Sequence, residues 1–363
     1  MQLNEYELKL LQQNKNETIN NELCIKEDQQ IRNLTFIEGI EANKLVLNEC
    51  FKVQLHNPPR NITSLVLISC NITNISGLKS MIWLKKLVLS KNPISNISAV
   101  SELVNLEYLS VNNTELVDIK CIQPLVNLKE LEFNSTNVSD ISVLEHLTNL
   151  DVLDLRHNQI SDISSLKYQQ RLTYLNLAGN KITDFTPLQR LTSLTELDLS
   201  QNTLHSAFIL LNLLNLTTLN LGECKLVDVT SLAHLKKIQS LNVEHNHITC
   251  IEPLLKLKLE HVDIERNLVR YNVYPFIFMR YINKQNEPTV QQNRMGDHIN
   301  CIYKVIALRV KILKRRNKMK SKIQKLKQRS SENLNMALER QYCFSQKIVN
   351  LVLRIEDDGS YLQ

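Results

Sequence analysis

Residues 150–171 read LDVLDLRHNQISDISSLKYQQR, and this stretch contains the pattern that decides the fold. Leu153 and Leu155 are two positions apart, so a short strand would point both side chains toward the same side. Further apolar residues follow at Ile160, Ile163 and Leu166, with Asn158 before the first of them. The stretch therefore predicts one short strand followed by a turn and a second buried segment.

The same pattern returns every 22 residues along the chain. Successive units begin at Ile62, Leu84, Leu106, Leu128, Leu150, Leu172, Leu194, Leu216 and Ile238. A tenth unit begins one residue early at Leu259, and the segments Leu23–Ile25 and Leu45–Leu47 resemble two earlier strands. A repeat of this length cannot bury its apolar side alone, so the units must stack into a solenoid. We expect about twelve parallel strands between Leu23 and Ile264.

This pattern resembles the leucine-rich-repeat family, whose repeats of about 20 to 29 residues each contain a strand. The form with aspartate after the second apolar position is similar to internalins and to the leucine-rich regulatory subunit of protein phosphatase 1. The resemblance covers roughly residues 20–285. It implies an α/β repeat fold, a right-handed solenoid with a concave parallel sheet, and a partner such as a phosphatase catalytic subunit bound on that sheet.

Three regions are predicted from the extent of the repeats and from changes in composition. We expect an N-terminal capping helix in residues 1–19, the solenoid with its C-terminal cap in residues 20–285, and a basic helical tail in residues 286–363. Between Lys304 and Arg329 the chain has 12 Lys or Arg and no Asp or Glu. Without these 12, the remaining 31 basic residues are outnumbered by 37 acidic ones, so the body of the protein is acidic.

The ninth position of each unit predicts a buried hydrogen-bond ladder. A side-chain amide there can bond backbone groups that no strand partner satisfies. The asparagines at this position are Asn92, Asn158, Asn180, Asn202, Asn246 and Asn267, and the smaller substitutes are Cys50, Cys70, Cys224, Thr114 and Thr136. Four residues later a short acidic side chain recurs at Asp118, Asp140, Asp162, Asp184 and Asp228, where it can cap a following turn.

No motif for nucleophilic, metal or phosphate chemistry stands out, so we expect a protein that is not an enzyme, with no cofactor and no small-molecule substrate. His245 and His247 have ligand-like spacing, but a third and fourth metal ligand are missing from the pattern. Eight cysteines without a CxxC motif, and a start without a signal-peptide pattern, indicate reduced thiols. We expect a protein of the cytoplasm, with the nucleus as the alternative.

The third, fifth and seventh positions of each unit alternate with the buried leucines and are expected to point outward on the concave sheet. These columns contain eight acidic residues and only two basic ones, Lys86 and Arg156. At the N-terminal end, Val66, Ile68 and Val88 are expected to form an exposed apolar patch. The predicted partner-binding residues are Val66, Ile68, Val88, Tyr108, Glu130, Glu132, Asp154, Arg156, Tyr174, Glu196, Asp198, Glu244, Asp263 and Glu265. Such a surface favours a protein partner with a basic surface.

The basic tail supports an alternative function. It could bind a nucleic acid, an anionic membrane or a calmodulin-type protein. The residues that would carry it are Lys311, Lys314, Arg315, Arg316, Lys318 and Lys320. No aromatic residue follows Tyr303 within the basic run, so base stacking is not indicated. A solvated helix that only keeps the protein soluble explains the same composition.

Overall fold

The computed structural model describes residues 22–26, 42–50, 55 and 60–269, which include nine complete 22-residue units and the first part of the tenth. Twelve parallel strands form one sheet in chain order, as the repeat predicts. The strands are β1 (Glu22–Lys26), β2 (Lys44–Asn48), β3 (Ser64–Ile68), β4 (Lys86–Val88), β5 (Tyr108–Ser110), β6 (Glu130–Glu132), β7 (Val152–Asp154), β8 (Tyr174–Asn176), β9 (Glu196–Asp198), β10 (Thr218–Asn220), β11 (Ser240–Asn242) and β12 (His261–Asp263). The predicted capping helix, C-terminal cap and basic tail lie outside the described residues.

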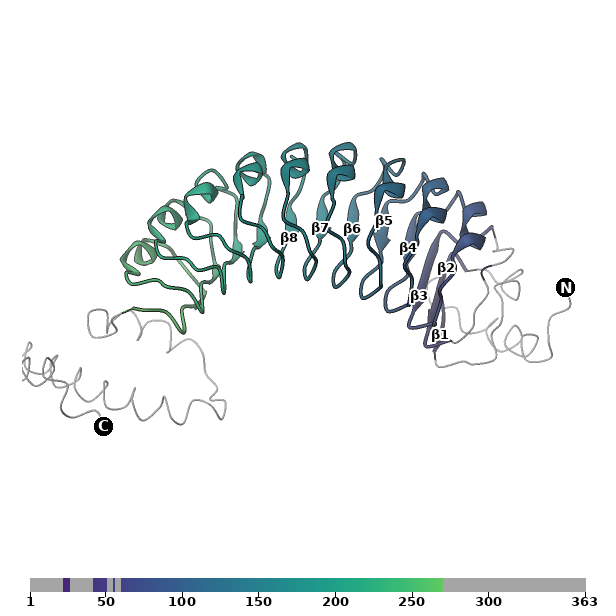
Figure 1. Cartoon of the computed structure of the whole chain (residues 1–363), viewed down its shortest axis with the longest axis horizontal. Coiled ribbons are helices and arrows are strands. Elements are labelled where there is room, and N and C mark those ends of the chain that lie inside the picture. Colours follow the sequence, from purple (N-terminus) through teal and green to yellow (C-terminus); the bar gives the residue numbers. More distant parts are fainter. Residues whose placement is uncertain (1–21, 27–41, 51–54, 56–59, 270–363) are drawn as a thin grey trace, which may run out of the picture. The chain divides into compact units, whose positions relative to one another are not determined.

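A short 3-10 helix follows each strand from β3 to β11 and lies on the outer side of the curve that the repeats follow (Figure 1). These helices are η2 (Ser76–Ser80), η3 (Ser98–Glu102), η4 (Lys120–Ile122), η5 (Ser142–His146), η6 (Ser164–Tyr168), η7 (Thr186–Arg190), η8 (Ala207–Leu210), η9 (Thr230–His234) and η10 (Glu252–Lys256). None of the helices in this part of the chain is long and apolar enough to cross a membrane.

The predicted aspartate caps stand just before these helices. Asp140 Oδ1 accepts a hydrogen bond of 2.9 Å from the backbone N–H of Ser142, the first residue of η5. Asp118, Asp162, Asp184 and Asp228 accept the equivalent bond in their own repeats. The hydrogen bonds from Ser142 hold the pKa of Asp140 below its ordinary value. The recurring aspartate therefore starts the outer turn by pairing an N–H that has no partner within the helix.

The core is a stack of apolar columns between the sheet and the 3-10 helices. Leu153, Leu175 and Leu197 stand in register at the centres of β7, β8 and β9, and none is more than 2% exposed. The first and sixth positions of the complete units are equally buried, including Phe133, the largest fully buried side chain. Because each coil rests on its two neighbours, the core is continuous from one repeat to the next.

Gln169 interrupts one of these columns. It occupies the twentieth position of its unit, where the flanking units have Leu147 and Leu191, and its side chain is fully buried. Its Nε2 donates to Leu144 O at 2.5 Å, but its Oε1 has no hydrogen-bond partner among the residues that the structure describes. A buried polar atom without a partner costs about 1 to 3 kcal/mol, so this repeat is less stable than a leucine would make it.

The asparagine ladder is present, and each side chain joins two coils. Asn180 Nδ2 donates to Leu155 O in the preceding coil at 3.0 Å and to Leu177 O in its own coil at 3.0 Å. Its Oδ1 accepts the backbone N–H of Ile160 at 3.1 Å. Cys224 takes the same place with its Sγ 3.2 Å from Leu199 O, and burial raises the pKa of this thiol to about 12. Cys70 and Cys224 thus fill a structural place in the ladder, where burial disfavours the reactive thiolate.

The eighth position, just before the ladder residue, has a left-handed backbone in every complete unit. The φ angle is 56° at His157, 64° at Gly179 and 51° at His245. This conformation is strained for residues other than glycine, and Gly179 is the only glycine among these positions. The neighbouring ladder bonds hold the backbone in this turn.

Candidate functional site

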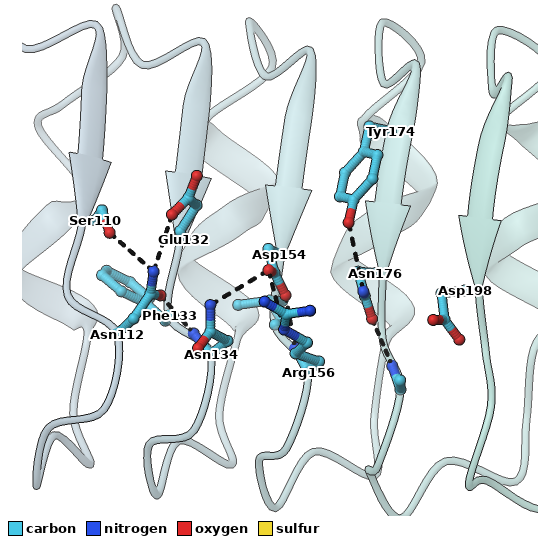
Figure 2. A network of polar contacts seen from close by, with 12 residues as sticks. Ser110, Asn112, Glu132, Phe133, Asn134, Asp154, Arg156, Tyr174, Asn176 and Asp198 are labelled. Atoms are coloured by element: carbon cyan, nitrogen blue, oxygen red, sulfur yellow. Dashed lines mark hydrogen bonds and ion pairs between the residues drawn. The ribbon is translucent and has the colours of Figure 1, made fainter. Parts of the chain in front are cut away.

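The outward side chains of the sheet come from the third, fifth and seventh positions of each unit, and we call this surface the sheet face. Successive residues of a strand point to opposite sides, so these three columns lie opposite the buried leucines. Figure 2 shows the central part of the sheet face, where polar side chains of adjacent strands point toward one another.

The predicted exposed apolar patch at the N-terminal end of the sheet face is wrong in part. Val66 and Val88 are each only 8% exposed, and Ile68 is partly exposed. The fifth position stands in the middle of the face, with third- and seventh-position side chains beside it on each strand. Strands about 4.8 Å apart leave a short side chain there enclosed by its neighbours. The same enclosure buries Ser110 and Asn176, at 2% and 4% exposure.

A polar network crosses the face between β5 and β6. Tyr108 Oη donates a hydrogen bond of 2.9 Å to Glu132 Oε1, and Asn112 Nδ2 donates one of 2.9 Å to Glu132 Oε2. Lys86 Nζ lies 3.7 Å from the centre of the Tyr108 ring, a cation–π contact. Burial and the charge of Glu132 raise the pKa of Tyr108 above its ordinary value. Each oxygen of Glu132 therefore accepts a hydrogen bond within the protein.

The network continues through Asp154 on β7 (Figure 2). Asp154 is 7% exposed; its Oδ2 lies 3.3 Å from Asn134 Nδ2 and 3.4 Å from Arg156 Nε. Asn134 is linked in turn to Asn112, whose Oδ1 accepts its backbone N–H at 2.9 Å. Burial raises the pKa of Asp154, while Arg156 opposes that shift. We call the linked residues Lys86, Tyr108, Asn112, Glu132, Asn134, Asp154 and Arg156 the network section.

A second feature recurs at the fifth position of six consecutive units, from β7 to β12. An Asp or Asn there accepts, through Oδ1, the backbone N–H two residues ahead. The pairs are Asp154 with Arg156 at 3.2 Å, Asn176 with Ala178 at 3.0 Å, Asp198 with Ser200 at 2.9 Å, Asn220 with Gly222 at 3.1 Å, Asn242 with Glu244 at 2.8 Å, and Asp263 with Glu265 at 3.0 Å. This side-chain bond pairs the backbone N–H of the second residue after the fifth position, just beyond the end of each strand.

The charges of the sheet face are segregated along the chain. From β1 to β7, Lys26, Lys44, Lys86 and Arg156 stand among Glu22, Glu130, Glu132 and Asp154. From β8 to β12 the three columns contain no Lys or Arg. Their carboxylates are Glu196, Asp198, Glu244, Asp263 and Glu265, which we call the acidic section. From β8 to β12, the only titratable base in these three columns is His261, an exposed residue of β12.

The carboxylates of the acidic section differ in how they are held. Within the described part of the chain, Glu196 and Glu265 are exposed and their carboxylates have no ion pair or hydrogen bond. Asp198 accepts hydrogen bonds from Ser200 and, at 3.0 Å, from Asn220 Nδ2. Glu244 accepts one of 3.1 Å from Asn242 Nδ2. The acidic section thus presents charge that no described cation offsets.

The remaining sequence candidates are less connected. Glu130 is exposed on β6, and Tyr174 Oη lies 3.4 Å from Asn176 Nδ2. His245 Nε2 lies 2.8 Å from Arg266 Nη1. The described residues contain no group of three or more His, Cys, Asp or Glu able to hold a metal ion. The basic tail residues Lys311–Lys320 lie outside the described residues.

Sequence reasoning missed the bridging residues Asn112 and Asn134, because nothing in the repeat pattern marks them. The fifth-position bond could have been found, since Asp or Asn occupies that position in six consecutive units.

Comparisons with known proteins agree with this architecture. The family model for Leucine Rich repeats (2 copies) matches residues 126–168 and 170–209. An internalin of Listeria monocytogenes is 26% identical with a TM-score of 0.50, and the match covers 67% of this chain and 86% of that one. A leucine-rich-repeat protein of Leptospira interrogans shares the fold at 24% identity and a TM-score of 0.53, over 66% of this chain and 74% of that one. No curated protein matches the sequence. The chain therefore has the leucine-rich-repeat fold, and its repeats are similar to those of an internalin.

Proposed function

We propose that this protein is a non-catalytic scaffold that binds a protein partner on the sheet face. The observation that carries the proposal is the network section, in which Tyr108, Glu132 and Asp154 are fixed by their own hydrogen bonds. Side chains that are already ordered lose little conformational entropy when a partner covers them. A long, continuous and prearranged polar surface is therefore suited to binding another macromolecule.

The partner we propose is a protein with a basic surface, met in the cytoplasm. The excess of carboxylates over cations on the sheet face supports this choice, because complementary charge speeds association and disfavours acidic partners. A phosphatase catalytic subunit is one candidate, which rests on the resemblance of the repeats to a phosphatase regulatory subunit. With Val66 and Val88 buried, an apolar anchor at the N-terminal end is not part of the proposal.

A bulky substitution on the sheet face tests the proposal. Thr218 is exposed at the third position of β10, so Thr218→Trp adds a large side chain to the face without entering the core. Both proteins, at full length, are used to capture the partner from extracts of the protein's own cells. We expect the variant to retain at most about a tenth of the partner that the parent retains, which corresponds to a loss of about 1.4 kcal/mol in binding free energy.

The matched control is Gln170→Trp, which places the same side chain at an exposed position just before β8 and outside the sheet face. It should retain the partner as the parent does. Equal retention by Thr218→Trp and the parent would show that the sheet face is not the binding surface. Thermal unfolding of both variants should match the parent, which establishes that any loss is local.

Binding through the basic segment from Lys304 to Arg329 stays a second hypothesis, favoured by its 12 cations without a carboxylate. It differs from the scaffold in its expected ligand, an RNA or an anionic vesicle, and in a steep dependence on salt.

A further inference from the structure

The ladder contains two cysteines in adjacent coils. The strands β2 and β3 pair in register along their whole length, and Cys50 and Cys70 each follow two residues after the end of their strand. The two side chains therefore hold the same place in successive coils. Both are fully buried in the core. Among the ladder residues that the structure describes, no other two neighbours are both thiols.

The sulfur of Cys70 points toward the coil that contains Cys50. Its Sγ lies 3.4 Å from Leu47 O in that coil and 3.3 Å from Ile68 O in its own. Burial raises the pKa of the Cys70 thiol to about 11, the N–H of Cys50 opposes this rise, and repulsion from a Cys50 thiolate adds to it. The two residues are thus close enough to act on each other electrostatically.

A disulfide between these side chains needs only small movements of the fold. Parallel strands lie about 4.8 Å apart, which is within the range of Cα separations that disulfides span. In-register side chains leave their strands in the same direction, so the Cβ atoms are also about 4.8 Å apart, slightly beyond the usual 3.5 to 4.5 Å. Cys50 Sγ lies 3.7 Å from Ile25 O, in the coil on its other side, so Cys50 must also rotate about its Cα–Cβ bond.

The bond formed in this way would be easy to reduce. The coils must move slightly closer to close it, and Cys70 gives up its thiol contacts with Leu47 O and Ile68 O. Strain in the oxidised form and lost contacts both favour the reduced form of a cysteine pair. Such a bond responds to redox conditions, whereas an unstrained disulfide would be a permanent crosslink.

We propose that Cys50 and Cys70 are a redox-sensitive pair, which forms a reversible disulfide between the coils of β2 and β3 when the protein meets a small-molecule disulfide such as oxidised glutathione. One thiolate attacks the oxidant, forming a mixed disulfide and releasing one glutathione. The second thiolate then attacks the protein sulfur of that mixed disulfide and releases the other glutathione. Two electrons and two protons pass from the cysteines to the oxidant, so the balance is complete.

Burial sets when this reaction occurs and what it does. The thiols meet the oxidant only while their coils are open, and coils near an end of a solenoid open more readily than central ones. The reaction is therefore slow. Once formed, the disulfide closes the segment between the two cysteines into a loop and opposes the same opening. Oxidation thus locks the first coils of the sheet.

The test is made on the full chain, incubated with an excess of oxidised glutathione. Remaining thiols are alkylated under denaturing conditions, and the protein is digested with trypsin without reduction. Cleavage after Lys44, Lys52, Arg60 and Lys79 places the two cysteines on the separate peptides 45–52 and 61–79. We expect mass spectrometry to find these peptides joined, and the link to disappear after transfer to reduced glutathione. Hydrogen exchange of the β2 and β3 amides should slow at least about tenfold in the joined form.

Two controls separate the pair from general oxidation. Cys224 is equally buried, but its ladder neighbours are Asn202 and Asn246, so it should be recovered alkylated and not joined to another cysteine. Cys70→Thr puts into the ladder the residue type that Thr114 has there, so the variant should fold and show no slower exchange after oxidation.

The proposal is overturned if Cys50 and Cys70 are recovered alkylated, or joined to other cysteines, under conditions that convert the exposed Cys24 to its glutathione adduct. It is also overturned if Cys70→Thr shows the same slowing of exchange as the parent, since the effect then does not come from this bond.

Discussion

Leu175→Asp is expected to unfold the central repeats and to lower the free energy of unfolding by about 3 to 5 kcal/mol. Leu175 is 1% exposed at the centre of β8 and stands in register with Leu153 and Leu197. An aspartate there would bury a charge with no cation beside it. Because each coil rests on its neighbours, the loss would spread to the adjoining repeats rather than stay within one.

Urea unfolding followed by circular dichroism measures this effect. Gln170→Asp is the control, since it places the same charge at an exposed position outside the sheet face and should change stability by less than about 0.5 kcal/mol. A Leu175→Asp protein that unfolds cooperatively at the urea concentration of the parent would mean that the fourth position does not point into the core.

Asn180→Ala is expected to lower the free energy of unfolding by about 1 to 3 kcal/mol. The side chain donates to Leu155 O and Leu177 O and accepts the N–H of Ile160, so an alanine leaves backbone groups of two coils without these bonds. Gly179 beside it has a left-handed backbone with φ of 64°, and the turn loses the bonds that hold it.

Thermal unfolding of two further variants identifies the cause. Asn180→Thr should lose less stability than the alanine variant, because Thr114 and Thr136 occupy the same register and donate to Val111 O and Phe133 O. Lys181→Ala, at the exposed neighbouring position, should unfold at the temperature of the parent. An alanine variant as stable as the parent would remove the ladder as a source of stability.

The periodic features of the fold could be predicted from the sequence because every coil meets the same constraints. Leu153 and Leu175, like Asn158 and Asn180, solve one packing problem in successive repeats, and a residue type that recurs every 22 positions reveals its role without a structure. The strands, the ladder and the Asp140-type caps were all accessible in this way, and the structure confirms them.

The sheet face was less predictable because its contacts are specific to pairs of side chains on different strands. Alternation correctly placed Val66 and Val88 on the outer side of the sheet but gave no measure of how closely their neighbours enclose them. The bonds from Tyr108 and Asn112 to Glu132 depend on side-chain lengths and rotamers that a repeat pattern does not contain. Counting carboxylates therefore overstated how many are available to a partner.

Carboxyl footprinting of the full chain, with and without its captured partner, tests most directly whether the partner binds on the sheet face. A carbodiimide labels exposed carboxylates, and mass spectrometry measures the labelling of each one. We expect the bound partner to protect Glu196 and Glu265 at least about fivefold, as burial beneath an interface would, and to leave Glu102 and Glu252 labelled as in the free protein. Protection confined to Glu102 and Glu252, with Glu196 and Glu265 labelled as before, would contradict the account and place the partner on the outer side of the repeats.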